Sequence, residues 1–132
     1  MATVFTRIIQ GEIPCHKIAE NENYLAFLDI RPISSGHTLV IPKKEIDYIF
    51  DVDDKILSGL MLFSKKVALA IQKSVDCTRV GIMVAGLEVP HCHIHLIPFK
   101  EINELNFANA KVASQEDLSK VAEKIKKNIV LN

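Results

Sequence analysis

The chain has 132 residues, of which 48% are hydrophobic and 24% charged, as expected for one globular domain with a real hydrophobic core. Sixteen basic and sixteen acidic residues cancel, so no global field recruits nucleic acid or an anionic membrane. No apolar run is long enough to cross a bilayer, the first residues lack the pattern of a secretion signal, and the three cysteines have no paired spacing. We therefore expect a cytoplasmic protein with free thiols, a single domain over residues 1–132, and no nucleic-acid or membrane partner.

The first half of the chain predicts one short helix and three strands. Thr3 can cap a helix over Val4–Gln10. Apolar runs bounded by turn residues then predict strands at His16–Glu20, Tyr24–Asp29 and His37–Ile41. Gly36, just before the third strand, permits an unusual backbone angle in the preceding loop.

The second half predicts one long helix, two strands and a terminal helix. The long helix begins at Asp53 or Asp54 and continues to about Lys73, with apolar residues at helical spacing. Two strands follow at Arg79–Ala85 and His91–Pro98, and Ser114 with Asp117 resembles a capping box that opens an amphipathic C-terminal helix. Short turns between strands predict an α+β fold, with an antiparallel sheet of about five strands and helices on one side. The core would span residues 3–99, with a helical extension over 100–132.

Histidines at alternate positions mark the segment Pro90–Pro98, with the sequence PHCHIHLIP. It holds three of the five histidines of the chain, His91, His93 and His95. A period of two predicts a strand on which the three imidazoles share one face, and on which the core-facing residues are Cys92, Ile94 and Leu96. An exposed strand face usually carries Thr, Lys and Glu instead, so we infer that this segment carries the function.

Two chemistries fit this spacing. Histidines on a strand can bind zinc or copper, but the outer residues of the three are about 13 Å apart, so one ion would struggle to hold all of them. A two-histidine site completed by a distant carboxylate stays open. The second chemistry is nucleophilic catalysis at phosphorus, in which His93 attacks and one neighbour orients it. The other neighbour contacts a phosphate oxygen or passes a proton to the leaving group.

The histidine segment is also similar to a known signature. His91–Ile97 (HCHIHLI) matches the pattern of the histidine-triad (HIT) family of nucleotide hydrolases and transferases. The likeness extends over about residues 3–99, since three further segments resemble the family in the same order: Phe5–Pro14, Phe27–Pro32 and Gly36–Lys43. Within the family, the chain most resembles the Hint-type nucleoside phosphoramidases.

The resemblance implies a role for each matched residue. His93 would be the nucleophile that takes the nucleoside monophosphate, and His91 and His95 would contact the phosphate. Asp29 would bind the ribose hydroxyls, and His37 would support the site without taking part in the chemistry. The remaining nucleotide-binding residues would be Phe5, Ile8, Phe27, Ile30, Gly86 and Val89. The resemblance also implies a homodimer that joins its two sheets, and no cofactor.

Two positions depart from the family pattern. Leu87 replaces a glutamine that normally contacts the phosphate region, and losing that hydrogen bond costs about 1–3 kcal/mol of transition-state stabilisation. Thr6 stands where some relatives carry a zinc-binding cysteine, so we predict no structural zinc. We expect an enzyme that releases AMP or another purine nucleotide from a phosphoramidate. The alternatives are a dinucleoside polyphosphate hydrolase, a nucleotide-binding module that has lost turnover, and a metal-dependent protein.

Overall fold

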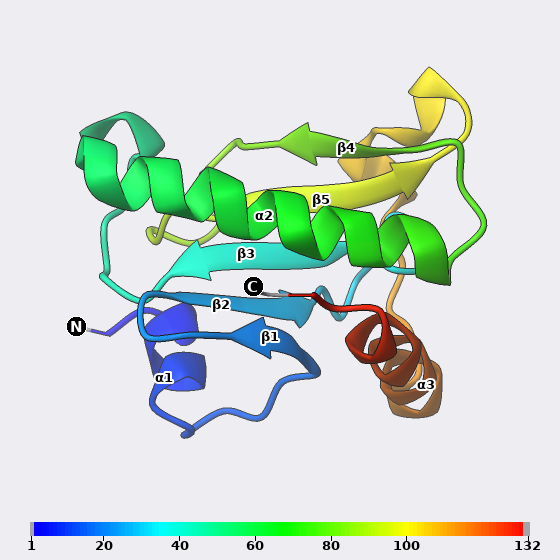
Figure 1. Ribbon diagram of the computed structural model, residues 1–132, viewed down its shortest axis with the longest axis horizontal. Helices are drawn as coiled ribbons and strands as arrows, with labels where there is room; N and C mark the ends of the chain where they lie inside the picture. Colours follow the sequence, from blue (N-terminus) through cyan, green and yellow to red (C-terminus); the bar gives the residue numbers. More distant parts are fainter. Residues whose placement is uncertain (1, 131–132) are drawn as a thin grey trace.

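A five-stranded antiparallel sheet forms the centre of the computed structural model, which describes residues 2–130 (Figure 1). The strands lie in the order β1-β2-β3-β5-β4, and each is antiparallel to its neighbours. Their bounds are β1 Lys17–Glu20, β2 Tyr24–Leu28, β3 Thr38–Pro42, β4 Arg79–Met83 and β5 Ile94–Phe99. The fold class predicted from the sequence is therefore confirmed.

Three α-helices surround the sheet within the described residues, and each begins at a capping side chain. They are α1 Val4–Ile9, α2 Asp54–Ser74 and α3 Gln115–Lys127. The connection from β3 to α2 contains the 3₁₀ helix η1 Ile49–Asp51, and the connection from β5 to α3 contains η2 Ile102–Glu104 and η3 Phe107–Asn109. Thr3, Asp53 and Ser114 each accept a hydrogen bond from the backbone N–H three residues later. The predicted helix starts are thus confirmed, because each side chain satisfies one of the free N–H groups of the first turn.

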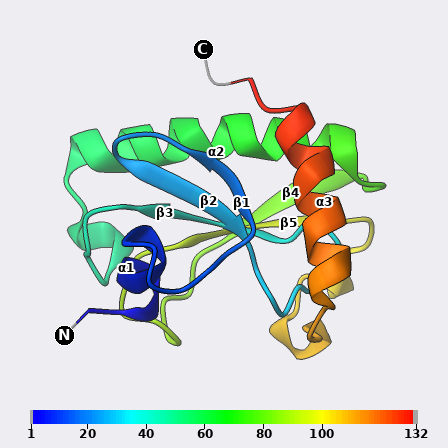
Figure 2. The ribbon, with the colours of Figure 1, turned by 90° about the horizontal axis from the view of Figure 1, so that it is seen from below.

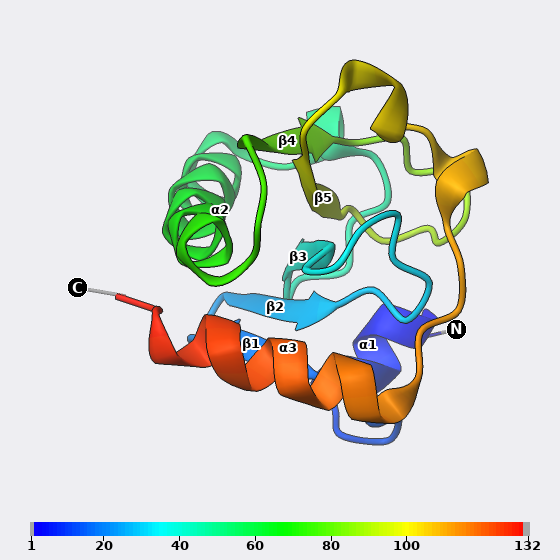
Figure 3. The same cartoon turned by 90° about the vertical axis from the view of Figure 1, so that its right-hand side faces the viewer.

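The helices cover both faces of the sheet, so the prediction of helices on one side is wrong. Figure 3 shows α2 on one face, with α1 and the segment from β5 to α3 on the other. Figure 2 shows α1 and α3 near opposite ends of the strands. The physical reason lies in β2 and β3, in which every residue is buried. Strands that are apolar on both faces need cover on both.

The side chains of β2 point alternately to the two faces of the sheet, and a separate hydrophobic cluster lies on each face. The even-numbered residues of β2 pack in the larger cluster under α2, which also contains Cys92, Ile94 and Leu96. Its odd-numbered residues, Leu25 and Phe27, pack in a smaller cluster with Phe5 of α1. The core positions predicted from the histidine segment are therefore confirmed, and the histidines alternate away from α2.

The strand that carries the histidines is shorter than predicted. The sequence indicates a strand over His91–Pro98, but β5 begins only at Ile94, so His91 and His93 lie in the segment that precedes it. This segment is held by a bond from the backbone N–H of Cys92 to the carbonyl of Ile46, 2.6 Å long, which lies outside the sheet ladder. The other predicted strands end within one or two residues of those observed, which is the ordinary uncertainty of such boundaries. No helix within residues 2–130 combines the length and the apolarity that crossing a bilayer requires.

Candidate active site

The loop between β2 and β3 places His37 against the histidine segment. The backbone N–H of Asp29 bonds to the carbonyl of His37, and that of His37 bonds to the carbonyl of Ser34, each at about 3 Å. The Ser34 hydroxyl donates to the carbonyl of Pro98 in β5 at 2.6 Å. Gly36 takes a φ of 98°, the unusual angle expected from the sequence. These bonds hold the His37 ring in a fixed, buried position.

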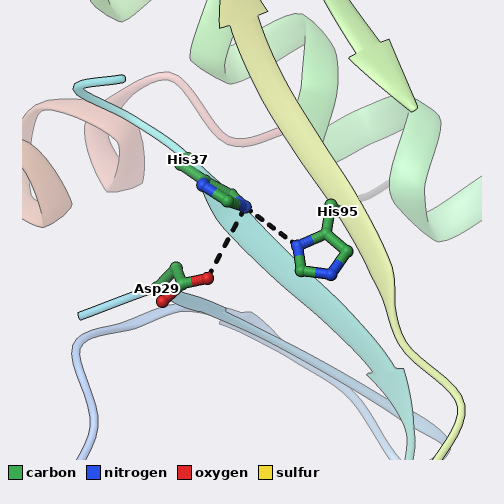
Figure 4. A group of neighbouring side chains, drawn as sticks. All are labelled: Asp29, His37 and His95. Atoms are coloured by element: carbon green, nitrogen blue, oxygen red, sulfur yellow. Dashed lines mark hydrogen bonds and ion pairs between the residues drawn. The ribbon is translucent and has the colours of Figure 1, made fainter. Parts of the chain in front are cut away.

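His37 and His95 share one hydrogen bond, which sets the tautomers of both rings (Figure 4). The backbone N–H of Ile33 donates to Nδ1 of His37 at 3.0 Å, so Nε2 of His37 carries the proton. That Nε2 lies 2.9 Å from Nδ1 of His95, which must accept. His95 therefore carries its own proton on Nε2. The carboxylate of Asp29 lies 3.6 Å from Nε2 of His37 and completes the group.

His91 and His93 are fixed in the same way by carbonyl oxygens, which can only accept. Nδ1 of His93 lies 2.7 Å from the carbonyl of His91, so Nδ1 donates and Nε2 of His93 keeps its lone pair. Nε2 of His91 donates to the carbonyl of Pro42 at 2.8 Å, and its Nδ1 accepts from the Thr3 hydroxyl at 3.2 Å. The segment thus presents one ring with a free lone pair, His93, beside one ring with an N–H donor, His95.

Burial lowers the pKa of His37, His95 and His91 and so favours their uncharged forms near neutral pH. Desolvation lowers the pKa of His37 to about 3, with a further contribution from His95. Desolvation also lowers the pKa of His95 to about 4, helped by the neighbouring His93. The pKa of His91 is lowered as well, again mainly by burial. Burial raises the pKa of the Asp29 carboxyl, which a backbone N–H bond from Arg31 partly offsets.

Asp29, His37 and His95 also meet the distance requirement for a metal site, since their ligand atoms lie within 4.8 Å of one another. The group differs from the site that the sequence left open, which took two histidines from the triad, because its second histidine is His37. A metal ligand must offer a lone pair, however, and Nε2 of His37 carries a proton as long as Ile33 donates to Nδ1. Binding a metal there would break the Ile33 bond inside a buried loop. The donor set fits a hydrogen-bond relay better than a metal centre.

The aromatic residues expected to bind the nucleoside pack beside His93. The Phe5 ring meets those of Phe27 and His93 edge-on, with centroids 5.6 and 5.0 Å apart. Phe5 and Phe27 are only 6% and 4% exposed, and Ile8 and Val89 pack against the same cluster. Phe5 therefore backs the His93 ring, and Phe5 and Phe27 offer a ligand little open surface, whereas Ile8 and Val89 are only half-buried.

Three residues of the predicted site, Asp29, Ile30 and His95, line a cavity of about 200 Å³, whereas His91 and His93 are not part of its lining. It is bounded by the loop after β2, the loop before the triad and the segment after β5, and its lining is Asp29, Ile30, Arg31, Glu88, His95, Phe107 and Ala110. Gly86, with a φ of 77°, lies in the second of these loops. A larger cavity of about 490 Å³ lies between the β2–β3 loop and α3, but its lining includes none of the triad histidines.

Three residues of the site were not predicted from the sequence. Thr3 was expected only to cap a helix, yet it also contacts His91. Phe107 packs on His95 with ring centroids 4.9 Å apart, although its segment has no recognisable motif. Glu88 lines the cavity, and its charge acts on Asp29. A signal existed for Glu88 alone, because it stands close before the triad in the chain.

Comparison with known proteins agrees with this geometry. The HIT domain family model matches residues 10–102. An uncharacterised HIT-like protein of Borreliella burgdorferi is 37% identical over 78% of this chain and 85% of its own. The adenosine 5'-monophosphoramidase of Schizosaccharomyces pombe is 38% identical over 74% of each chain.

Solved structures agree as well. A Hit-like protein from Bartonella henselae superposes with a TM-score of 0.86 at 32% identity, over 96% of both chains. A zinc-bound histidine triad family protein from Mycobacterium smegmatis gives 0.84 at 28% identity, over 97% of this chain and 93% of its own. The family model, the relatives and the fold all agree, and the chain belongs to the HIT family.

Proposed function

We propose that the protein hydrolyses a purine nucleoside 5'-phosphoramidate, with AMP as the expected nucleotide product, through a nucleotidyl-His93 intermediate. At the level of its family it is a nucleotide-binding hydrolase. The observation that carries the proposal is the pair of opposite tautomers. His93 keeps a lone pair on Nε2, and His95 beside it, with ring centroids 4.9 Å apart, keeps a proton on Nε2. A nucleophile next to a neutral donor suits attack on an anionic phosphoryl group.

The reaction would proceed in two displacements. Nε2 of His93 attacks the phosphorus, the P–N bond breaks, and the leaving nitrogen keeps the electron pair and takes a proton from solvent. Water then attacks the same phosphorus, the bond to His93 breaks, and the water returns one proton to solvent. The Nε2–H of His95 donates to a phosphoryl oxygen in both steps, and the carbonyl of His91 accepts from Nδ1 of His93 as charge develops on that ring.

The phosphoramidate is preferred as substrate because of the Schizosaccharomyces pombe relative, whose name is adenosine 5'-monophosphoramidase. The ribose would bind to Asp29, whose side chain is 21% exposed and lines the cavity. Because Phe5 and Phe27 are nearly buried, the base would contact their exposed edges and Ile30, which is 57% exposed. His91 would act through His93, because both its ring nitrogens are already bonded to Thr3 and Pro42.

A nucleotide-binding module with weak turnover is the second candidate, and Leu87 favours it. Leu87 is 92% exposed and has no polar atom in its side chain, so it offers no hydrogen bond where the family has a glutamine. A dinucleoside polyphosphate hydrolase would need more cationic groups around the phosphates. The cavity beside His95 has one, Arg31.

We further propose a homodimer joined through β4. This strand is at the edge of the sheet, and its outer backbone groups have no partner strand within residues 2–130. An apolar groove of about 360 Å³ lies between β4 and α2, and its exposed side chains include Met61, Leu62, Leu69 and Ile82. An open edge next to an apolar surface favours pairing with a second copy. The three free cysteines agree with a reducing, cytoplasmic location.

The test is release of AMP from adenosine 5'-phosphoramidate by the wild type, His93→Ala and His16→Ala, each with and without a chelator. His16 is a suitable control because it lies outside the cluster and bonds to Gln115. We expect the wild type and His16→Ala to turn over and His93→Ala to lose about a thousandfold or more. Wild-type binding of AMP without turnover would favour the module, and loss of activity with chelator alone would favour a metal enzyme.

A further inference from the structure

The cavity beside His95 has an uneven distribution of charge. Two carboxylates, Asp29 and Glu88, face it together with one guanidinium, Arg31, while burial keeps His95 neutral. Glu88 is exposed and forms no ion pair with any residue between 2 and 130. A carboxylate without a protein partner, at the edge of a site that must bind an anionic phosphoryl group, is unfavourable unless the rest of the substrate compensates for it.

An aromatic ring forms another wall of the same cavity. Phe107 in η3 packs on His95, with centroids 4.9 Å apart, and remains 37% exposed. Its segment is fixed by backbone bonds to the loop after β2, from Ala113 to Ile30 at 3.1 Å and from Lys111 to Pro32 at 3.3 Å. A fixed phenyl ring next to a free carboxylate is a common way to bind an ammonium group. The face of the ring has a negative electrostatic potential, and the carboxylate carries a negative charge.

The reaction geometry directs the leaving group to this place. In an in-line displacement the leaving group departs on the side of phosphorus opposite the attacking atom. The attacking residue His93 lies outside the lining of this cavity and the phosphate donor His95 lies within it, so we place the leaving group on the cavity side, near Phe107 and Glu88. The volume of about 200 Å³ is below the usual range for drug-sized ligands, so the space left beside a ribose at Asp29 suits a small amine better than a second nucleotide.

We infer that Glu88 and Phe107 select the leaving group, and that the preferred substrate is a phosphoramidate whose leaving amine carries a second, protonated amino group. This inference rests on the proposed function, since it concerns the leaving group of that reaction. Glu88 would pair with the distal ammonium at the solvent edge, and the Phe107 ring would contact it from the side. The same carboxylate would repel the phosphates of a dinucleoside polyphosphate.

The test compares adenosine 5'-phosphoramidates of two amines with matched length, 1,3-diaminopropane and n-butylamine. The measured quantity is the ratio of their kcat/KM values at low salt, for the wild type, Glu88→Gln, Phe107→Leu and the control Glu22→Gln. Glu22 is also exposed, but it lies in the β1–β2 turn, at the other end of β2 from Asp29. Because the amines differ in basicity, the criterion is how each substitution changes the ratio.

We expect Glu88→Gln to lower the ratio by about two- to fivefold, the range of an exposed ion pair, and added salt to lower the wild-type ratio. Phe107→Leu should lower it by a similar factor, and Glu22→Gln should leave it as in the wild type. An unchanged ratio in Glu88→Gln, or an equal change in Glu22→Gln, would overturn the inference while leaving the proposed function intact. Failure of the wild type to cleave either compound would overturn both.

Discussion

Acidification from pH 7 to pH 5 should destabilise the protein by about 4 kcal/mol through two side chains. His37 and His95 are 1% and 6% exposed, and burial lowers their pKa values to about 3 and about 4, from 6.5. In the unfolded chain both rings bind a proton as the pH falls below 6.5, whereas in the folded protein they do not. Their contribution is therefore fully present above pH 6.5 and is lost as the pH falls toward the folded pKa values.

The magnitude follows from the same pKa values. At pH 5 the unfolded rings are almost fully protonated and the folded rings almost fully neutral, so each contributes 1.36 kcal/mol for each of about 1.5 pH units, or about 2 kcal/mol. The sum is a large share of the about 5–15 kcal/mol that stabilises an ordinary domain. His91 should add to the loss, since its pKa is also lowered by burial.

The assay is urea unfolding followed by circular dichroism at half-unit steps between pH 7 and pH 5. His37→Asn separates the contribution of one ring. This variant should be less stable at pH 7, because the Ile33 and His95 bonds change, but its loss between pH 7 and pH 5 should be smaller by about 2 kcal/mol. A wild-type stability that stays constant over this range would refute the reasoning. So would a variant that shows the full wild-type loss.

Three further outcomes follow from local geometry. Leu87→Gln should raise kcat/KM for adenosine 5'-phosphoramidate by about fivefold or more, since it restores a polar contact near the phosphate, and steady-state kinetics would measure the change. Gly59→Ala should lower the free energy of unfolding by about 1–3 kcal/mol, because a methyl group would overlap the Tyr24 ring, and this exceeds the propensity gain expected of alanine in a helix. Exposed Ser58→Ala is the control in the same urea titration and should show no such loss. Ile82→Lys should convert the proposed dimer to a monomer in sedimentation velocity, and an unchanged sedimentation coefficient would place the interface elsewhere.

The sequence predicted most of the fold because the strands and helices carry strong local patterns. The alternation of apolar residues in Cys92–Leu96 correctly identified the core face of the histidine segment. The helix caps Thr3, Asp53 and Ser114 were recognisable because a side-chain oxygen three residues before an N–H group satisfies it locally. The two-sided cover of the sheet was missed, because a fully apolar strand does not reveal which other segments of the chain will pack on each face.

The site was harder to predict, because its decisive contacts join distant parts of the chain. His37 and His95 are 58 residues apart, and Thr3 and His91 are 88 apart. The strand pairing of β3 with β5 places Leu39 opposite His95, and this pairing brings the β2–β3 loop beside the triad. Phe107 depends on the path of an irregular segment, which has no periodicity to read. Spacing alone therefore indicated the three histidines of the triad, and only the family resemblance gave His37 a supporting role.

The hydrogen bonds of the cluster connect its stability to its chemistry. The backbone N–H of Ile33 assigns the proton of His37, and His37 in turn assigns that of His95. The carbonyl of His91 fixes the proton of His93 on Nδ1. The first two assignments hold only while His37 and His95 are neutral, because a second proton on either ring would place two N–H groups against each other. Burial of His37 and His95 makes the fold sensitive to acid. The same burial keeps His95 as a neutral N–H donor beside the lone pair of His93, so the exclusion of water that favours the chemistry also lowers the stability in acid.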